Sequence, residues 1–179
     1  MLRGELVNQL LAILFSATGP VTLSELQTVF PDVGAEALGK AIEKLEAQFN
    51  AFQDAVEIRR VAGGFLMTTR PDRHEVIRAY LRTKPSAKLS QAALETLAVI
   101  AYKQPVTLPE IMEIRGIKGS STISTLLEKK LIAIRGRKKV VGRPILYGTT
   151  PEFLIHFGLN DLSELPSLEE FEELVSASQ

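Results

Sequence analysis

Apolar residues near the start of the chain recur at the spacing of an α-helix. Leucines stand four residues apart from Leu6 through Leu10 to Leu14, and their neighbours widen the apolar stripe. This spacing predicts a helix over residues 4–17. The Gly-Pro pair at 19–20 then breaks the helical pattern.

The segment after this break carries the features that start a second helix. Thr22 and Glu25 have the Thr-x-x-Glu spacing of a capping box, in which the hydroxyl accepts from the third helical residue and the carboxylate accepts from the threonine amide. Val21 and Leu26 occupy the two positions of a hydrophobic staple. These four residues predict where the helix begins and how the chain enters it.

Nearly the same seven residues occur again later in the chain, as PVTLSEL at 20–26 and PVTLPEI at 105–111. Thr107 and Glu110 repeat the capping box. Pro109 falls in the first helical turn, where its missing N–H has no intrahelical partner to lose. The repeat therefore predicts the same local architecture twice.

The two copies continue in parallel. Each has an apolar first helix and a third helix with apolar residues at intervals of three and four. Each then changes to two short β-type segments and ends in a further helix. The predicted helices are 35–49 (Leu38, Ile42, Leu45, Phe49), 72–81, 93–102, a helix from 121 carrying Ile123, Leu126, Leu127 and Leu131, and 152–157. The predicted hairpins are 55–61 with 65–69 about Gly63–Gly64, and 131–137 with 144–150 about the basic turn 138–143.

Three helices followed by a hairpin are the plan of a winged helix, in which the hairpin is the wing. Two copies predict a mainly α fold with small β-hairpins (α+β), built as tandem winged-helix domains. The expected divisions are an N-terminal winged-helix domain over 1–83, a polar linker over 84–90, a C-terminal winged-helix domain over 91–160 and an acidic C-terminal tail over 161–179. Ser90 is placed to cap the helix after the linker.

The composition of the 179-residue chain is that of a globular protein, with 45% apolar and 23% charged residues. Lys plus Arg equals Asp plus Glu at 21 each, so net charge gives no general attraction to DNA or to an anionic membrane. Cysteine is absent, which fits a reducing cytoplasm. The apolar run at 10–15 resembles a signal peptide, but Glu5 and the break at 19–20 favour a core helix over a targeting or membrane segment.

The sequence offers little for catalysis. Its two histidines, His74 and His156, lie in different predicted helices without nearby metal-ligand partners, which favours structural or surface roles. GIKGSS at 116–121 lacks the Gly-Lys-Ser/Thr order of a phosphate-binding loop and is interpreted as a glycine-rich turn. We expect no enzymatic activity, no cofactor, no metal site and no small-molecule substrate.

DNA binding is the competing function, because a helix-turn-helix places its recognition helix in the major groove. The third helix of the first copy is net acidic, and that of the second lacks Arg, Asn and Gln in its first turns, which disfavours sequence-specific reading. A basic cluster remains on and around the second wing: Arg135, Arg137, Lys138, Lys139 and Arg143. It fits DNA phosphates or an acidic partner, or else a solvated tip neutralised by Glu169, Glu170, Glu172 and Glu173 of the tail.

PILY at 144–147 stands beside this cluster and is predicted as an apolar strand at the edge of a small sheet. An exposed edge invites another chain to pair with it. In the competing interpretation, Ile145 and Tyr147 pack on the third helix while Leu146 faces outward.

Several of these segments resemble the segregation and condensation protein B family. They are ALETLAVIAYKQPVTLPEIMEIRGI (93–117), LLEKKLI (126–132), GRPILYGTT (142–150) and FLIHFGLNDLSELP (153–166), with a looser likeness in LLAILFSATGPVTLSEL (10–26) and GGFLMTTRPD (63–72). The resemblance covers about residues 6–166. Leu11 stands where the family typically has an acid in its opening helix.

The resemblance implies a non-enzymatic accessory subunit of a bacterial SMC–kleisin complex, located in the cytoplasm with the nucleoid. Such a protein forms a homodimer, binds the kleisin subunit (segregation and condensation protein A) and through it the SMC ATPase, and contacts DNA weakly or indirectly. For this chain we expect kleisin contact by Arg137, Arg143, Ile145, Leu146 and Tyr147, and a dimer surface that includes Leu6, Leu10 and Ile13. The alternative is a winged-helix DNA-binding transcriptional regulator that uses the basic second wing.

Overall fold

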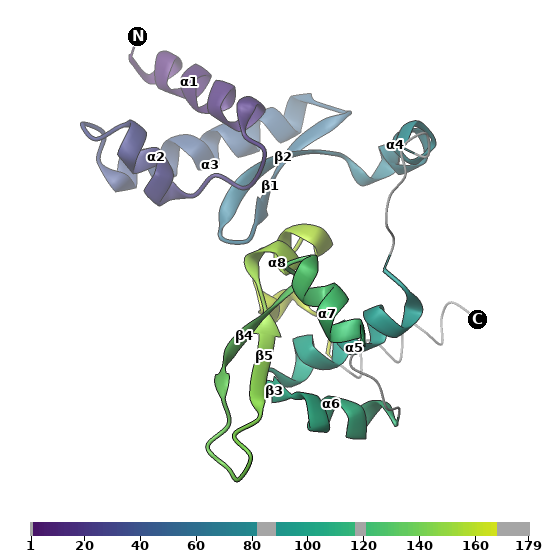
Figure 1. Cartoon of the computed structure of the whole chain (residues 1–179). Coiled ribbons are helices and arrows are strands. Elements are labelled where there is room, and N and C mark those ends of the chain that lie inside the picture. The colour runs from purple at the N-terminus through teal and green to yellow at the C-terminus, as the bar shows by residue number, and fades with distance from the viewer. Residues whose placement is uncertain (1, 82–88, 117–120, 168–179) are drawn as a thin grey trace. The chain divides into compact units, whose positions relative to one another are not determined.

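The structure is a computed structural model that describes residues 2–81, 89–116 and 121–167. The chain divides into two compact units, Met1–Pro85 with Gly158–Gln179, and Ser86–Phe157. Each unit has its own helices and its own small antiparallel sheet (Figure 1). The fold is therefore mixed α+β, and the winged-helix interpretation of each unit stays a prediction.

Parts of three predicted segments fall outside the described residues. These are residues 84–88 of the linker, residues 117–120 of the glycine-rich turn and residues 168–179 of the acidic tail, with its four neighbouring glutamates.

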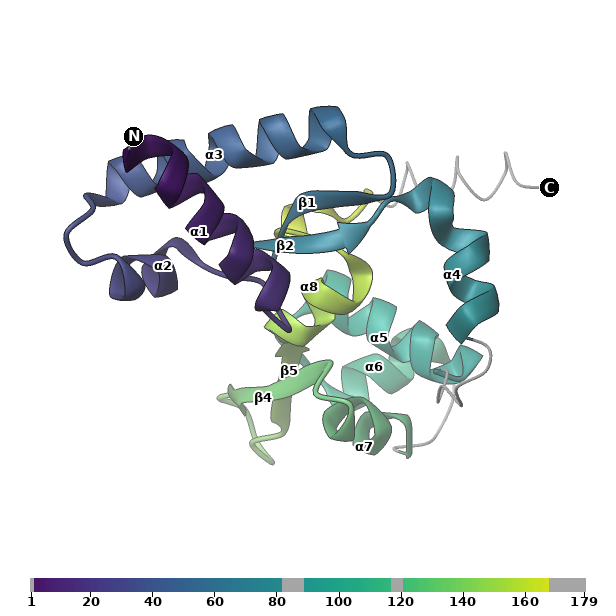
Figure 2. The same ribbon diagram turned by 90° about the horizontal axis from the view of Figure 1, so that it is seen from above.

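The first unit combines three helices with a hairpin. Helices α1 (Leu2–Ser16), α2 (Leu23–Val29) and α3 (Ala35–Phe52) are followed by strands β1 (Val56–Val61) and β2 (Gly64–Thr69) (Figure 2). A 3₁₀ turn, η1 (Pro71–Arg73), then leads into α4 (His74–Leu81), which buries none of its residues.

The core of the first unit lies where these three helices meet the hairpin. In α3 the spacing of three and four places Leu38, Ile42 and Leu45 on one buried face, as predicted. The full set of buried core residues is Leu10, Leu14, Val21, Leu26, Leu38, Ile42, Leu45, Ile58 and Phe65.

The second unit has the same order of elements with one addition. Helices α5 (Gln91–Lys103), α6 (Leu108–Arg115) and α7 (Ser121–Glu128) precede strands β4 (Ile132–Arg137) and β5 (Ile145–Thr149), and α8 (Pro151–Phe157) closes the unit. The addition is a two-residue strand, β3 (Val106–Thr107), which completes a sheet in the order β3–β5–β4. Ser90 caps α5 as predicted, because its hydroxyl accepts from the N–H of Ala93.

Both predicted capping boxes are confirmed. In the first unit the N–H of Glu25 donates to Thr22 Oγ1 at 3.2 Å, and the N–H of Thr22 donates to Glu25 Oε2 at 2.8 Å. In the second unit Glu110 Oε2 accepts from the N–H of Thr107 at 2.8 Å and from its hydroxyl at 2.6 Å. The second and sixth helices thus begin at the residues that the sequence indicates.

The repeated Pro-Val-Thr segments also pair with the hairpins, which the sequence did not reveal. Val21 and Phe65 exchange two backbone hydrogen bonds, each 2.9 Å long. Val106 is the corresponding partner of Tyr147. In each unit, therefore, the valine that precedes the capped helix is joined to the second strand of the hairpin.

Two local predictions are wrong. The first hairpin turns at Ala62–Gly63 instead of Gly63–Gly64, because Ala62 (φ 50°) and Gly63 (φ 75°) both adopt the positive φ that a type I′ turn requires. Leu131 lies beyond the end of α7, because Lys130 takes a left-handed conformation at φ 57° and ends the helix. The Leu131 side chain is nevertheless buried.

Residues that follow α8 pack on the turn of the first hairpin. The carbonyl of Leu159 accepts from the N–H of Ala62 at 2.9 Å, and Asn160 Oδ1 accepts from the N–H of Gly63 at 3.1 Å. A short 3₁₀ turn, η2 (Leu162–Glu164), comes next. The second unit thus ends at Phe157, and the residues from Gly158 onward belong to the first unit.

The pairing of Val21 with the hairpin leaves no room for a side chain at Gly64. A Cβ at Gly64 would lie 2.9 Å from the carbonyl oxygen of Val21 and 3.1 Å from Pro20 Cβ. We expect Gly64→Ala to push these strands apart and to lower the free energy of unfolding by about 1–3 kcal/mol, the usual cost of overpacking. Urea unfolding followed by circular dichroism measures this.

The matched control is Gly39→Ala in α3, where an added Cβ meets nothing within 4 Å. That substitution is expected to raise the free energy of unfolding by about 0.5–1 kcal/mol, because alanine favours a helix interior. Equal effects of the two substitutions would contradict the close approach at Gly64.

Candidate partner-binding surfaces

Strand β5 is the central strand of its sheet. Leu146 and Tyr147 pair with the Val106–Thr107 segment on one side and with β4 on the other. Gln104 adds to the bonding along this edge of β5, because its Oε1 accepts from the N–H of Thr149 at 2.8 Å and from the Thr149 hydroxyl at 3.0 Å. The prediction that PILY forms an exposed edge is wrong, because the segment before α6 occupies that edge.

The five residues predicted to contact a kleisin do not share one face. Tyr147 is 7% exposed and belongs to the core. Ile145 lies opposite Arg137 in the strand register, so these two side chains are on the same face of the hairpin. Leu146 is on the opposite face, since successive side chains of a strand alternate. Arg143 lies in the turn beyond the paired strands.

Ile134 extends the face on which the exposed Arg137 and the half-buried Ile145 lie. It pairs with Tyr147 and is 58% exposed, while Ile132, two residues earlier on the same strand, is buried. We call Ile134, Arg137 and Ile145 the wing face. Ile134 was not among the predicted residues, although the alternation of Ile132 and Ile134 indicates that the apolar face continues along the strand.

The outer edge of β4 is modified by a β-bulge. The register shifts between Ile134 and Gly136, so Arg135 is the extra residue. Its guanidinium Nη2 donates to the carbonyl of Thr149. A bulge and a charged side chain at an edge limit pairing with another strand, so side-chain contact with the wing face is the favoured mode.

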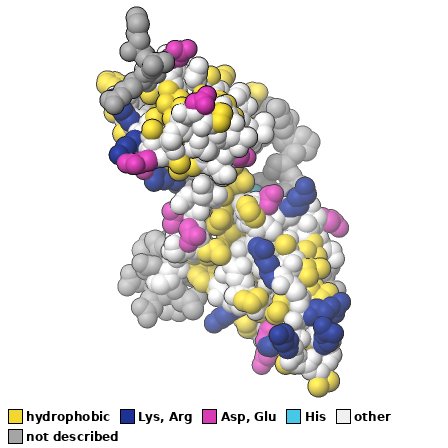
Figure 3. All heavy atoms as spheres, turned by 90° about the vertical axis from the view of Figure 1, so that its left-hand side faces the viewer, with side chains coloured by type: hydrophobic (Ala, Val, Ile, Leu, Met, Phe, Trp, Pro, Cys, Tyr) yellow, Lys and Arg dark blue, Asp and Glu magenta, His cyan; other side chains and the backbone are white. Residues whose placement is uncertain are grey.

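Further basic side chains lie beyond the wing face, toward the turn. Figure 3 shows Lys and Arg side chains gathered along this end of the second unit. Arg137 Nη1 donates to the carbonyl of Arg143 at 3.1 Å. Within the described residues, the side chains of Lys139 and Arg143 make no hydrogen bond or ion pair.

Lys138 connects the wing to the capping box of α6. Its Nζ lies 2.5 Å from Glu110 Oε1, while the other oxygen of that carboxylate accepts from Thr107. The bond from Lys138, followed by those from Thr107, lowers the pKa of Glu110 to about 2 from its ordinary 4.5. In the first unit the bonds from Thr22 lower the pKa of Glu25 without a lysine.

The residues predicted for a dimer surface lie mostly inside the first unit. Leu10 is 0% exposed and belongs to the core, so it offers no surface to a second copy. Leu6 and Ile13 are half-buried and pack against that core. Their helical spacing marks the inner face of α1.

The outer face of α1 is exposed and uncharged. Phe15 is 80% exposed, and no charged residue occurs between Leu6 and Ser16. We call Asn8, Leu11, Ala12 and Phe15 the α1 face, of which Leu11 is half-buried against the core and the other three are exposed. It borders a shallow groove whose other residues are Phe49, Gln53, Val56 and Met67. The absence of charge on an exposed helix was the sequence signal for this surface.

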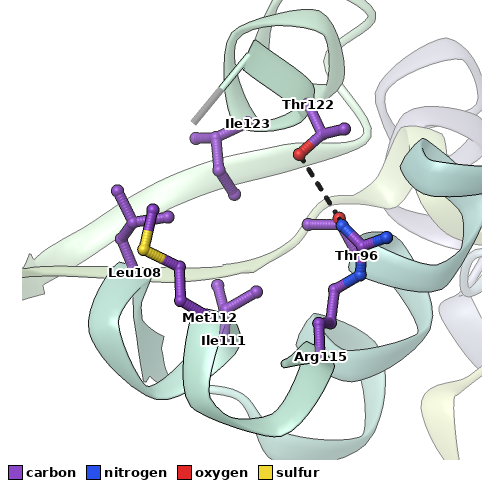
Figure 4. A pocket seen from close by; sticks show the side chains of 7 residues that line it. All are labelled: Thr96, Leu108, Ile111, Met112, Arg115, Thr122 and Ile123. Carbon is purple, nitrogen blue, oxygen red and sulfur yellow. Dashed lines mark hydrogen bonds between the residues drawn. The ribbon is translucent and has the colours of Figure 1, made fainter. Parts of the chain in front are cut away.

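A small pocket between α5, α6 and α7 is lined by polar groups that bond to one another (Figure 4). Arg115 Nη1 donates to Thr96 Oγ1 at 2.6 Å, and its Nη2 donates to Glu95 Oε2 at 2.7 Å. Thr96 and Thr122 share a hydrogen bond of 3.3 Å. The other lining residues are Leu108, Ile111, Met112 and Ile123. We interpret this pocket as a gap in the packing of the three helices and not as a ligand site.

The described residues offer no evident metal centre. Across residues 2–81, 89–116 and 121–167, no group of three or more His, Asp or Glu residues is placed to hold a metal ion. His74 and His156 are both exposed. In the same ranges, no helix has the length and apolar character needed to cross a membrane.

Exposed apolar faces beside unpaired basic groups are typical of a protein that acts by binding other macromolecules. Comparison with known families shows which group of binding proteins this chain belongs to. The family described as segregation and condensation complex subunit ScpB matches residues 8–168. The chain belongs to this family, and its place is therefore among the proteins of chromosome segregation and condensation.

Two sequence relatives agree with this membership. Segregation and condensation protein B of Desulforamulus reducens is 44% identical over 171 residues, which cover 96% of this chain and 93% of the relative. That of Myxococcus xanthus is 44% identical over 163 residues, which cover 91% of this chain but 49% of the relative, so the chain spans about half of its length. The crystal structure of ScpB from Mycobacterium tuberculosis has 29% identity, covers 88% of this chain and 97% of that one, and gives a TM-score of 0.42.

The ion pair between Lys138 and Glu110 can be tested by titration. An NMR titration of the Glu110 side-chain carboxyl should give a pKa of about 2 in the unaltered protein. In Lys138→Gln that pKa should rise, yet stay below 4.5, because the bonds from Thr107 remain. An unaltered protein in which Glu110 titrates near 4.5 would contradict the pairing.

The same pair predicts how stability depends on pH. Because the folded-state pKa of Glu110 is depressed, its contribution is fully present above about pH 4.5 and is lost as pH falls toward 2. The stability difference between the unaltered protein and Lys138→Gln should therefore shrink over that window. Lys40→Gln, which removes an exposed lysine from α3, is the control and should show a smaller pH-dependent difference.

Proposed function

We propose that this chain is a non-enzymatic accessory subunit of a bacterial SMC–kleisin complex. In this proposal it binds the kleisin subunit, segregation and condensation protein A, and through it the SMC ATPase, and it acts in the cytoplasm at the nucleoid. Family membership over residues 8–168 supports the proposal. The observation that carries it is the exposed wing face beside basic side chains.

The wing face has the composition expected of a peptide-binding surface. Ile134 and Ile145 offer apolar contact, and Arg137 lies directly across from Ile145. An apolar kleisin residue would pack on the two isoleucines, and an acidic neighbour would pair with Arg137. Arg143, farther along the wing, would meet a second acidic residue. Leu146 would support this surface from the opposite face of β5, and the buried Tyr147, two residues along from Ile145, would support it from the same face.

The helices support protein binding over sequence-specific DNA reading. The proposal treats each unit as a winged helix, with α3 and α7 as the helices that would enter a groove. The residues of α3 itself are net acidic, with three glutamates against two lysines, and Arg60 of β1 pairs with two of those glutamates at 3.6 and 3.1 Å. In α7 the single charged residue is Glu128. Neither helix suits a groove lined by phosphates, so a transcriptional regulator is the weaker proposal.

The α1 face supports the proposal of a homodimer. A second copy would cover Phe15 and the uncharged outer side of α1, with the groove toward Met67 receiving an aromatic or leucine side chain. An isologous contact uses the same patch twice, and an uncharged patch avoids the like-charge repulsion that self-association otherwise incurs. The inner residues Leu6 and Ile13 would contribute indirectly, by fixing the helix.

The kleisin interface is tested by calorimetry with a purified central fragment of the kleisin. Ile134→Glu should weaken binding by about tenfold or more, because it places an unpaired charge in an apolar contact. Ile114→Glu on α6, where the native side chain is 53% exposed, is the matched control and should bind as the unaltered protein does. If both variants bound the kleisin fragment with equal affinity, the wing face would be excluded as the kleisin-binding site.

The dimer is tested by light scattering at tens of micromolar protein. The unaltered chain should give the mass of two copies, and Phe15→Glu should give the mass of one, since two carboxylates would face each other across the contact. Val29→Glu changes another exposed apolar residue of the first unit, 59% exposed, and should stay dimeric. If the unaltered chain gave the mass of one copy, the proposal of a homodimer would be wrong.

A further inference from the structure

The second wing ends in a tip that backbone hydrogen bonds hold in place. The N–H of Lys138 donates to the carbonyl of Pro144, and the N–H of Arg143 donates to the carbonyl of Val140, each at 2.9 Å. The second bond closes a four-residue turn over 140–143. Gly142, at φ 83°, occupies the position where a type II turn requires positive φ. The tip thus has a defined shape.

This turn holds an apolar residue at its apex. Val141 is 102% exposed, and Val140 beside it is 50% exposed. Neither packs into the core of the unit, so their placement does not stabilise the sheet. Figure 3 shows hydrophobic side chains at the end of this wing, with Lys and Arg side chains behind them. An apolar apex on a hydrogen-bonded turn suggests contact with something outside the unit.

The charge around the apex is positive and local. Lys138 is paired with Glu110, but Arg137, Lys139 and Arg143 form no ion pair within the described residues. The chain as a whole has a formal net charge of zero, so any attraction of a polyanion would come from this tip and not from the overall field.

We propose that this wing tip binds duplex DNA, with Lys139 on the phosphates and Val141 against the minor groove. The minor groove is about 6 Å wide, too narrow for a helix but suited to the side chains of a hairpin apex. Proteins that bind there use Arg, Lys, Asn or Gln and frequently add an apolar side chain. Phosphate contacts carry no sequence information, and a valine forms no hydrogen bond to a base edge, so this contact does not read bases directly.

Two other polyanions fit this charge less well. An anionic membrane favours aromatic or long apolar side chains at the point of entry, whereas this apex offers two valines. An acidic peptide would be recognised by the charges alone and would leave the apolar apex in water. Membership of a chromosome segregation and condensation family also favours DNA.

The experiment measures binding of a short fluorescent DNA duplex by anisotropy between about 50 and 200 mM salt. The logarithm of the binding constant should fall with the logarithm of salt concentration. Lys139→Gln should reduce the magnitude of that slope by about 0.9, the value for one phosphate contact. Lys40→Gln, an exposed lysine of the first unit, should leave it unchanged. Val141→Ser should weaken binding severalfold without changing the slope.

Three results would overturn the inference. One is equal slopes for Lys139→Gln and Lys40→Gln. Another is unaltered affinity of Val141→Ser. The third is binding of polyglutamate, or of phosphatidylserine vesicles, as tight as binding of the duplex at the same salt and equally lost in Lys139→Gln. The inference does not rest on kleisin binding, because Lys139 and Val141 lie outside the wing face, and a chain that ignored kleisin yet showed this DNA pattern would support it.

Discussion

Each unit depends on a short backbone pairing between the valine that precedes its capped helix and the second strand of its hairpin. Val21 pairs with Phe65, and Val106 pairs with Tyr147. Because the capping box begins at the next residue, this pairing fixes the start of a helix and the position of a strand together. The helices then close over a core that includes both partners, all four of which are less than a tenth exposed. The repeated Pro-Val-Thr segments therefore join a helix to the sheet in each unit.

The two units differ in what they build on this pairing. The residue before the paired aromatic is Gly64 in the first unit, where the chain approaches too closely for a side chain, and Leu146 in the second, where a second pair forms with Thr107. The first hairpin closes in the two residues Ala62–Gly63, whereas the second extends through 138–144 before β5 begins. The longer, basic wing belongs to one unit alone, and both proposed binding surfaces of that unit lie on it.

Much of the architecture could be predicted because it is encoded locally. Capping boxes, helical periodicity and turn residues each involve neighbours within four positions, and they located the helices and both hairpins. The sheet order could not be predicted, because a two-residue strand such as Val106–Thr107 has no periodicity of its own. The burial of individual residues could not be predicted either. Leu10 and Phe15 are both large apolar residues of one helix, and only packing decides that Leu10 lies in the core and Phe15 at the surface. The alternation of Ile132 and Ile134 is visible in the sequence, but only the structure shows that Ile132 is buried and Ile134 exposed.

The central claim is that the second unit binds a kleisin through its wing, and hydrogen–deuterium exchange with mass spectrometry tests it most directly. The full chain would be labelled alone and with the central fragment of the kleisin. We predict slower exchange at residues 132–149 in the complex, with little change in α2 and α3 of the first unit. A stable complex whose protection lies outside residues 132–149, or no complex at all, would contradict the account.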